Sequence, residues 1–169
     1  MVPHGKAFSP VDYTLTLPNL PTLKCPVLGV HSTKLLMSIS GIGPFFSVLI
    51  LYEIDDISRF RDERKLCSYA GLVPSTYASG GKVFHGRITK MGSKWLRWAL
   101  IEAAQTAIRS DSELHAYYQR LRVRKGTNAA KVATARRLLT IVYRLLCQKR
   151  FYEKRTIMEK KALVALVTP

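Results

Sequence analysis

A long segment without any charged residue, residues 35–52, most constrains how this chain can fold. Its length is close to the roughly 20 residues that a membrane-spanning helix needs. The middle of the segment, however, is Gly41-Ile42-Gly43-Pro44, and glycine and proline together end a helix. We therefore expect two short buried helices and no membrane span. The first would begin with Ser32 as N-cap and run to Ile39, and the second would run from Pro44 to Glu53.

Two short helices around a glycine turn make a helix-hairpin-helix. The backbone N–H groups of such a turn, with the N-terminus of the second helix, can hold a phosphate. Gly41, Ile42 and Gly43 are therefore predicted nucleic-acid contacts. A single glycine hairpin is also common in core turns, so this motif needs support from the rest of the chain.

The chain is strongly basic, with 27 Lys and Arg against 11 Asp and Glu and a formal net charge of +16 over 169 residues. Residues 64–101 contain no acid, and residues 120–155 contain only Glu153. A short charge run is usually a solvated face, but two long ones favour nucleic acid over an anionic membrane. The predicted phosphate contacts are Lys82, Arg87, Lys90, Lys94, Arg97, Arg136 and Arg137.

The composition indicates one folded domain in a reducing compartment. Apolar residues make up 47% of the chain, which is enough for a core. Its three cysteines, Cys25, Cys67 and Cys147, are odd in number and lack the spacing of zinc ligands. Neither a disulfide framework nor a zinc site is expected, and the cytoplasm is the predicted location.

The chain divides into three predicted stretches: an irregular, proline-containing segment at 1–30, a helical domain at 31–150 and a basic tail at 151–169. The fold class is mainly α: a helical bundle with a helix-hairpin-helix element. Residues 72–92, rich in glycine, predict a loop or small β-hairpin in which residues 82–84 pair with residues 87–89.

Helical periodicity predicts three further helices towards the C-terminus. Ser93 caps the first, and Ser110 with Glu113 has the spacing of a capping box for the second. The last begins at Thr127 or Asn128. The aromatic residues at helical spacing are expected to be core rather than base-stacking surfaces; they are Trp95, Trp98, Tyr117 and Tyr118.

A cluster of acids at the end of the second helix, Glu53, Asp55 and Asp56, invites a metal hypothesis. Acids at a helix end and turn more often cap and orient the backbone, so no metal site is predicted in this chain.

A series of short motifs runs along the chain. The motifs are Ile39-Ser40-Gly41-Ile42-Gly43-Pro44, Leu66-Cys67-Ser68-Tyr69-Ala70-Gly71-Leu72-Val73-Pro74, Ser79-Gly80, Ile88-Thr89-Lys90-Met91-Gly92 and Leu96-Arg97. In the order and spacing of these motifs, the chain resembles, over roughly residues 34–150, the C-terminal domain of insertion-sequence transposases of the 110/116/902 family. This resemblance implies a DNA-mobilising recombinase that joins an N-terminal RuvC-like nuclease domain to this helical domain. It also implies guidance by an RNA and chemistry through a serine of the C-terminal domain.

The family serine matches Ser79. Gly80 and Gly81 permit close backbone approach, and cationic residues that can stabilise developing charge follow nearby. A serine before two glycines is alone usually a turn residue, and the resemblance makes Ser79 the predicted catalytic residue. Ser75 is the second choice, and His85 is expected to contact backbone or phosphate.

The sequence departs from the family pattern at its start, because residues 1–30 are too short and proline-rich for a RuvC-like domain. We therefore expect a truncated transposase product that is an enzyme only if a nuclease domain is supplied elsewhere. A divalent metal such as Mg²⁺ is expected for that domain only, with no cofactor in this chain. The expected partners are DNA, a guide RNA, and a second copy in a homo-oligomer or an intact transposase.

Two alternatives remain at this point. The first is a catalytically inactive nucleic-acid-binding module that uses the same glycine turn and basic segments. The second is a basic ribosome-associated protein, which matches the charge but leaves the Ser79-Gly80 motif unexplained.

Overall fold

The computed structural model describes residues 30–79 and 81–153, and for residues 30, 77–79 and 82–85 it describes the backbone only. The helices are α1 (Val30–Met37), α2 (Pro44–Ile54), α3 (Glu63–Tyr69), α4 (Lys94–Ser110), α5 (Ser112–Lys125) and α6 (Thr127–Gln148), with a 3-10 turn η1 (Ile57–Arg59). Strands β1 (Pro74–Ser79) and β2 (Lys82–Ile88) form an antiparallel hairpin. The mainly α fold with one small hairpin is confirmed. Most of the predicted N-terminal segment and C-terminal tail lies outside the described residues.

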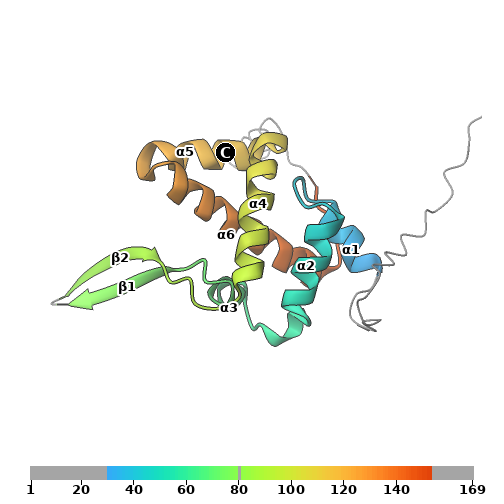
Figure 1. Ribbon diagram of the computed structural model, residues 1–169, viewed down its shortest axis with the longest axis horizontal. Helices are drawn as coiled ribbons and strands as arrows, with labels where there is room; N and C mark the ends of the chain where they lie inside the picture. Colours follow the sequence, from blue (N-terminus) through green and yellow to red (C-terminus); the bar gives the residue numbers. More distant parts are fainter. Residues whose placement is uncertain (1–29, 80, 154–169) are drawn as a thin grey trace, which may run out of the picture.

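Helix α4 lies at the centre of the helical body, in contact with α2, α5 and α6 (Figure 1). Its predicted core face is confirmed, because every residue of it is buried: Leu96, Ala99, Leu100, Ala103, Ala104, Ala107 and Ile108. The alanines have small side chains, so neighbouring helices can approach the α4 backbone closely. From α6, Leu138, Leu139 and Val142 complete the core.

The charge-free segment folds as the two predicted helices, α1 and α2, with Pro44 at the start of α2. No helix within the described ranges is long and apolar enough to cross a membrane. The turn packs directly on α4: a Cβ on Gly41 would lie 2.5 Å from the Ala103 oxygen and 2.6 Å from the Ala107 nitrogen. Gly41 also has φ +98°, so this position requires glycine on both counts.

Two of the predicted helix caps are wrong. Ser32 does not cap α1, because the helix already includes Val30. Ser110 is the last residue of α4 and its hydroxyl bonds to the Thr106 oxygen at 3.1 Å. The cap of α5 is instead Asp111, whose carboxylate accepts two backbone N–H bonds and therefore caps better than a hydroxyl. The Ser93 cap of α4 is confirmed by its bond from the Leu96 N–H at 3.0 Å.

The hairpin exists, but its predicted pairing is wrong. Residues 82–84 and residues 87–88 lie on the same strand, β2, and their partner is β1. The register pairs Ser79 with Lys82, so the strands reverse direction between these two residues and not at His85-Gly86. A connection of two residues matches the twist of paired strands and is therefore preferred.

The expectation that the aromatic residues are core is correct for Tyr118, which is 9% exposed, and wrong for both tryptophans. Trp95 is 53% exposed and Trp98 is 43% exposed. The reason is their place on α4: about 100° per residue separates positions on a helix, so they point away from the face that Leu96 and Leu100 bury.

We expect Gly41→Ala to lower the free energy of unfolding by about 2–4 kcal/mol, because the new methyl group overpacks α4 and the left-handed backbone is strained. Gly43→Ala is the matched control: Gly43 has φ −84° and nothing lies within 4 Å of its Cβ position. We expect this control to lower the free energy of unfolding by less than about 1 kcal/mol. Urea unfolding followed by circular dichroism measures both changes. Equal losses for the two variants would contradict the close approach of the turn to α4.

Candidate nucleic-acid interface

The predicted catalytic residue, Ser79, is the last residue of β1. Its backbone is in register with that of Lys82 on β2. Gly81 has φ +75°, and a Cβ there would meet nothing within 4 Å. In Figure 1 the two strands extend away from the helices. The backbone therefore holds Ser79 next to an open turn and clear of the helical body.

Two backbone hydrogen bonds hold the base of the hairpin, one to Val73, just before β1, and one to Tyr69, the last residue of α3. The N–H of Thr89 donates to the Val73 oxygen at 2.9 Å, and the N–H of Ser93 donates to the Tyr69 oxygen at 3.0 Å. The strand that leaves the hairpin is thereby fixed before α4 begins.

Two glycines let the chain segments at this base touch. A Cβ on Gly71 would lie 2.5 Å from the Met91 oxygen, and one on Gly92 would lie 2.0 Å from the Tyr69 oxygen. Both have positive φ, +66° for Gly71 and +103° for Gly92. These glycines of the family-like motifs therefore position the hairpin and need not contact a ligand.

The start of α4 is tied to the end of α2 through Ser93. Its hydroxyl donates to the Glu53 carboxylate at 2.6 Å while it caps α4. Asp56 caps η1, and the hydrogen bonds from Ser58 lower the pKa of the Asp56 carboxyl. The expectation that these acids cap and orient is thus confirmed for Glu53 and Asp56. The described residues contain no group of three His, Cys, Asp or Glu side chains that could hold a metal ion.

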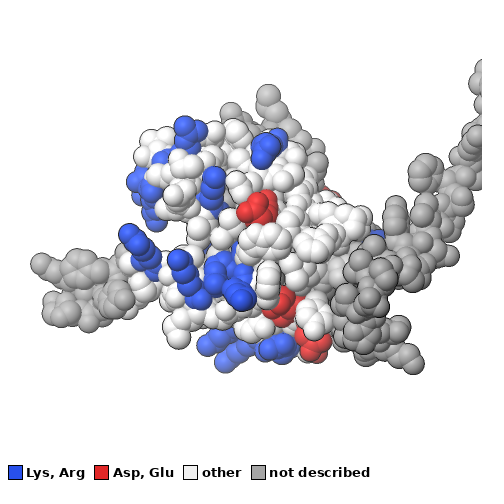
Figure 2. Space-filling model, in the orientation of Figure 1, with Lys and Arg blue, Asp and Glu red and all other residues white. Residues whose placement is uncertain are grey.

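Four of the predicted phosphate contacts lie around this base. Arg87, Lys90 and Lys94 are exposed, and none of the three forms an ion pair with a carboxylate of the described chain. Arg97 is half-buried and donates from Nη1 to the Ala70 oxygen at 3.0 Å, so part of its guanidinium positions α3. Figure 2 shows Lys and Arg side chains gathered beside the hairpin base. Of Lys82 and His85, only the backbone place on β2 is described.

The structure places the two predicted α6 contacts elsewhere. Arg137 forms an ion pair with Glu113 of α5 at 2.6 Å and lies 4.8 Å from the centre of the Tyr117 ring. Arg136 lies beside Cys67 of α3, where burial raises the pKa of the thiol and the arginine opposes that rise. Both arginines are half-buried, so they are not part of the basic group at the hairpin base, and their role in binding stays a prediction.

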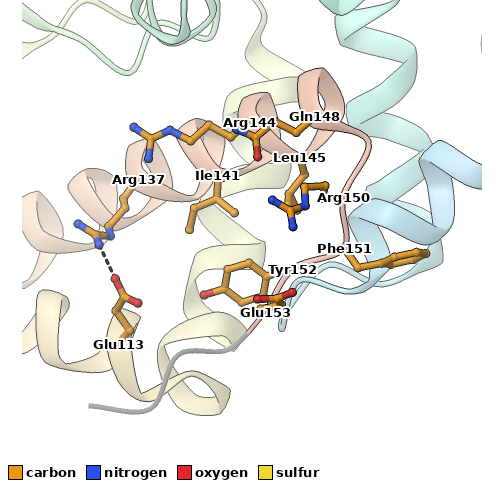
Figure 3. A pocket seen from close by; sticks show the side chains of 10 residues that line it. All are labelled: Glu113, Arg137, Ile141, Arg144, Leu145, Gln148, Arg150, Phe151, Tyr152 and Glu153. Carbon is orange, nitrogen blue, oxygen red and sulfur yellow. Dashed lines mark hydrogen bonds and ion pairs between the residues drawn. The ribbon is translucent and has the colours of Figure 1, made fainter. Parts of the chain in front are cut away.

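A cavity of about 520 Å³ lies at the C-terminal end of α6 (Figure 3). Arg137 and Arg144 line it, and each is paired with a carboxylate, Arg137 with Glu113 and Arg144 with Glu63 at 3.1 Å. Tyr152 also lines it, with its hydroxyl donating to Asp111 at 2.8 Å; burial, and then this bond, raises the pKa of Tyr152. Two of the three arginines that line the cavity, Arg137 and Arg144, are thus compensated by carboxylates, and Arg150 and Glu153 also line it.

The glycine turn between α1 and α2 serves packing first. Ile42 is 3% exposed, so its side chain belongs to the core. Gly41 is pressed against α4, and only Gly43 faces open space. Phosphate binding by the amides of this turn stays a prediction.

Sequence reasoning missed two features of this region. Asp62 caps α3 by accepting the N–H of Lys65 at 2.8 Å, and an Asp directly before a helical run could have indicated this. The second is the exposure of Trp95 and Trp98. Both tryptophans lie in the segment without acids, residues 64–101, and this position in a basic segment could have indicated that they are exposed.

The part of the chain that contains the hairpin and its base is similar to known proteins. Residues 33–119, about half of the chain, match the family model described as transposase IS116/IS110/IS902 family. The matched range includes the glycine turn, the whole hairpin and α4.

Individual relatives agree with this match. The chain is 29% identical over 135 residues to a probable family 20 transposase of Pseudomonas aeruginosa, covering 77% of this chain and 40% of the relative. It is 31% identical over 134 residues to the transposase for insertion sequence element IS1111A of Coxiella burnetii, covering 77% and 37%. A pilin gene-inverting protein of Moraxella bovis is 33% identical over 128 residues, covering 74% and 40%.

The chain thus spans 40% or less of the length of these curated relatives. On the family match and these relatives together, the chain belongs to the IS116/IS110/IS902 family of transposases.

Proposed function

We propose that this chain is the DNA-binding, serine-bearing part of an insertion-sequence transposase and that Ser79 forms the covalent bond to DNA. The observation that supports this best is the place of Ser79, which ends β1 beside an open glycine turn and is opposite Lys82 in the strand register. The exposed cations Arg87, Lys90 and Lys94 at the hairpin base form no ion pair with a carboxylate of the described residues, and they would hold the phosphate backbone.

The step itself is a transesterification. The Ser79 oxygen attacks a backbone phosphorus, one P–O bond of the DNA strand breaks, and the serine proton ends on the leaving oxygen, which becomes a free hydroxyl. The phosphodiester count is conserved, so the hydroxyl of another strand can reverse the reaction and exchange strands. A serine hydroxyl is a weak nucleophile, and cationic side chains near the phosphate stabilise the charge that develops on it.

A divalent metal such as Mg²⁺ does not fit the described part of the chain, which offers no cluster of three ligating side chains. The proposed attack of Ser79 on the DNA therefore uses no metal held by the described residues. In the proposal, metal-dependent chemistry belongs to a RuvC-like nuclease domain of the kind that the family resemblance implies. DNA, a guide RNA and a second transposase copy are the proposed partners.

The second candidate function is a nucleic-acid-binding module without chemistry. The observation that favours it is the basic character of the chain, which supports binding whether or not Ser79 reacts. Both functions share the same contacts, so only a covalent product separates them.

We predict that the chain forms a covalent adduct with DNA and that Ser79→Ala abolishes it. The mixture would contain element-end DNA, RNA made from the element, and a full-length relative whose matching serine is replaced, so that it supplies only its remaining domains. On a denaturing gel, the adduct migrates above the free chain of 19.1 kDa and well below an adduct of the full-length relative. Ser75→Ala is the matched control, because the Ser75 hydroxyl donates to the Arg87 oxygen at 3.0 Å and its loss should leave the adduct intact. An adduct that survives in Ser79→Ala would exclude Ser79 as the nucleophile.

For binding, we expect Lys90→Ala with Lys94→Ala to reduce the slope of log K against log salt by roughly 2, because each phosphate contact contributes about 0.9. Arg124→Ala with Lys125→Ala removes the same charge from the exposed end of α5 and should leave the slope nearly unchanged. Fluorescence anisotropy with labelled duplex DNA gives both slopes. Equal reductions would show that binding is spread over the whole basic surface rather than centred on the hairpin base.

A further inference from the structure

Four aromatic rings form a connected surface on α2 and α4, which we call the aromatic surface: Phe45, Phe46, Trp95 and Trp98. Phe45, Trp95 and Trp98 are exposed, whereas Phe46 is half-buried and packs against the core. Ring centroids of Trp98 lie 5.7 Å from Phe46, 6.5 Å from Phe45 and 6.3 Å from Trp95, all in edge-on geometry. Phe45 is 66% exposed, more than either tryptophan. Rings in mutual contact are held in place, so this surface is preformed.

The three exposed rings are not among the residues that build the core, and only Phe46 packs against it. The face of α4 towards α2 and α6 is filled by leucine and alanine, and α2 buries Ile50, Leu51 and Ile54 instead. Exposed apolar side chains that cluster rather than scatter mark an interaction surface. The aromatic surface therefore has a role outside the fold.

The charges around the aromatic surface favour an anionic partner. Lys94 lies directly on it, with Nζ 5.2 Å from the centre of the Trp95 ring. The exposed Lys90 precedes Lys94 at the hairpin base, and Figure 2 shows the basic groups gathered there. The nearest acids along the helices are engaged: Glu53 accepts from Ser93, and Glu102 accepts from Gln105 at 3.1 Å.

We propose that the aromatic surface binds unpaired nucleobases, which stack on Trp95, Trp98 and Phe45 while the connecting phosphates lie along Lys94 and Lys90. Stacking platforms flanked by cations are how proteins hold single strands, and paired bases cannot offer their faces in this way. A protein partner would also cover aromatic rings, but it would not need the adjoining unpaired lysines. The proposal rests on the proposed function in that it requires nucleic-acid binding, and it adds that opened strands are recognised on a second surface beside the hairpin.

The chain offers a direct probe, because Trp95 and Trp98 are its two tryptophans. We expect an oligothymidine or oligouridine strand to quench the tryptophan emission at the same concentrations at which anisotropy detects its binding. Duplex DNA of the same length should bind without comparable quenching. Stronger quenching by one of the two strands identifies DNA or RNA as the source of the bases.

Variants separate stacking from simple charge attraction. Phe45→Ala keeps both tryptophans and should weaken single-strand binding roughly tenfold, within the range for loss of one stacked base, while duplex affinity stays unchanged. Val123→Ala is the control, since Val123 is 87% exposed on α5 and lies outside the aromatic surface. Circular dichroism of each variant verifies that the fold is retained.

Other outcomes overturn the proposal in distinguishable ways. Single-strand binding without quenching would leave the proposed function intact and exclude stacking on this surface. Emission that is already shielded from acrylamide, or that shifts to the blue as protein concentration rises, would mean that protein covers the rings. Failure to bind any nucleic acid would instead refute the proposed function itself.

Discussion

The close approach of other elements to the backbone of α4 is the constraint on which the rest of the structure depends. The core face of α4 has small side chains at four positions, Ala99, Ala103, Ala104 and Ala107, and Gly41 brings the α1–α2 turn within contact of Ala103 and Ala107. Small residues at a helix crossing shorten the distance between the axes, so leucines from α6 can fill the core around it. Glycine at 41 is therefore a packing requirement before it is a ligand contact.

The hairpin that presents Ser79 depends on the same helix. The first turn of α4 is capped by Ser93, which is in turn bonded to Glu53 of α2, and Arg97 reaches across to the Ala70 oxygen. The backbone contacts of Gly71 and Gly92 hold α3 against the exit of β2. The backbone position of Ser79 at the end of β1 is thus set by the packed helical body. A rigid base would suit the proposed attack of Ser79 on a bulky, rigid substrate.

The periodic parts of the fold could be predicted from the sequence, and the local details could not. Leucine and alanine at helical spacing predicted the core face of α4, and the Gly-Ile-Gly-Pro run predicted the break between α1 and α2, because both depend on near neighbours. Asp111 rather than Ser110 is the N-cap of α5, because two adjacent residues can both cap a helix and their spacing does not predict which one does. Strand pairing was misassigned because Gly86 resembles a turn residue as much as Gly80 does. Trp95 and Trp98 were placed in the core because hydropathy does not tell which face of a helix a partner will cover. The candidate site residues came chiefly from the family resemblance, and their geometry, such as the engagement of Arg97 and the ion pair of Arg137, depends on contacts between elements distant in sequence.

The proposed function requires a phosphate ester that joins the Ser79 oxygen to the DNA. The most direct measurement is mass spectrometry of the nucleotide-linked peptide, after nuclease and protease digestion of a recombination mixture in which the strands are trapped. We expect a nucleotide attached at Ser79 and not at the neighbouring hydroxyls of Ser75 or Tyr77. A nucleotide on either of those residues, or recombination that proceeds with no protein–DNA bond at all, would contradict it.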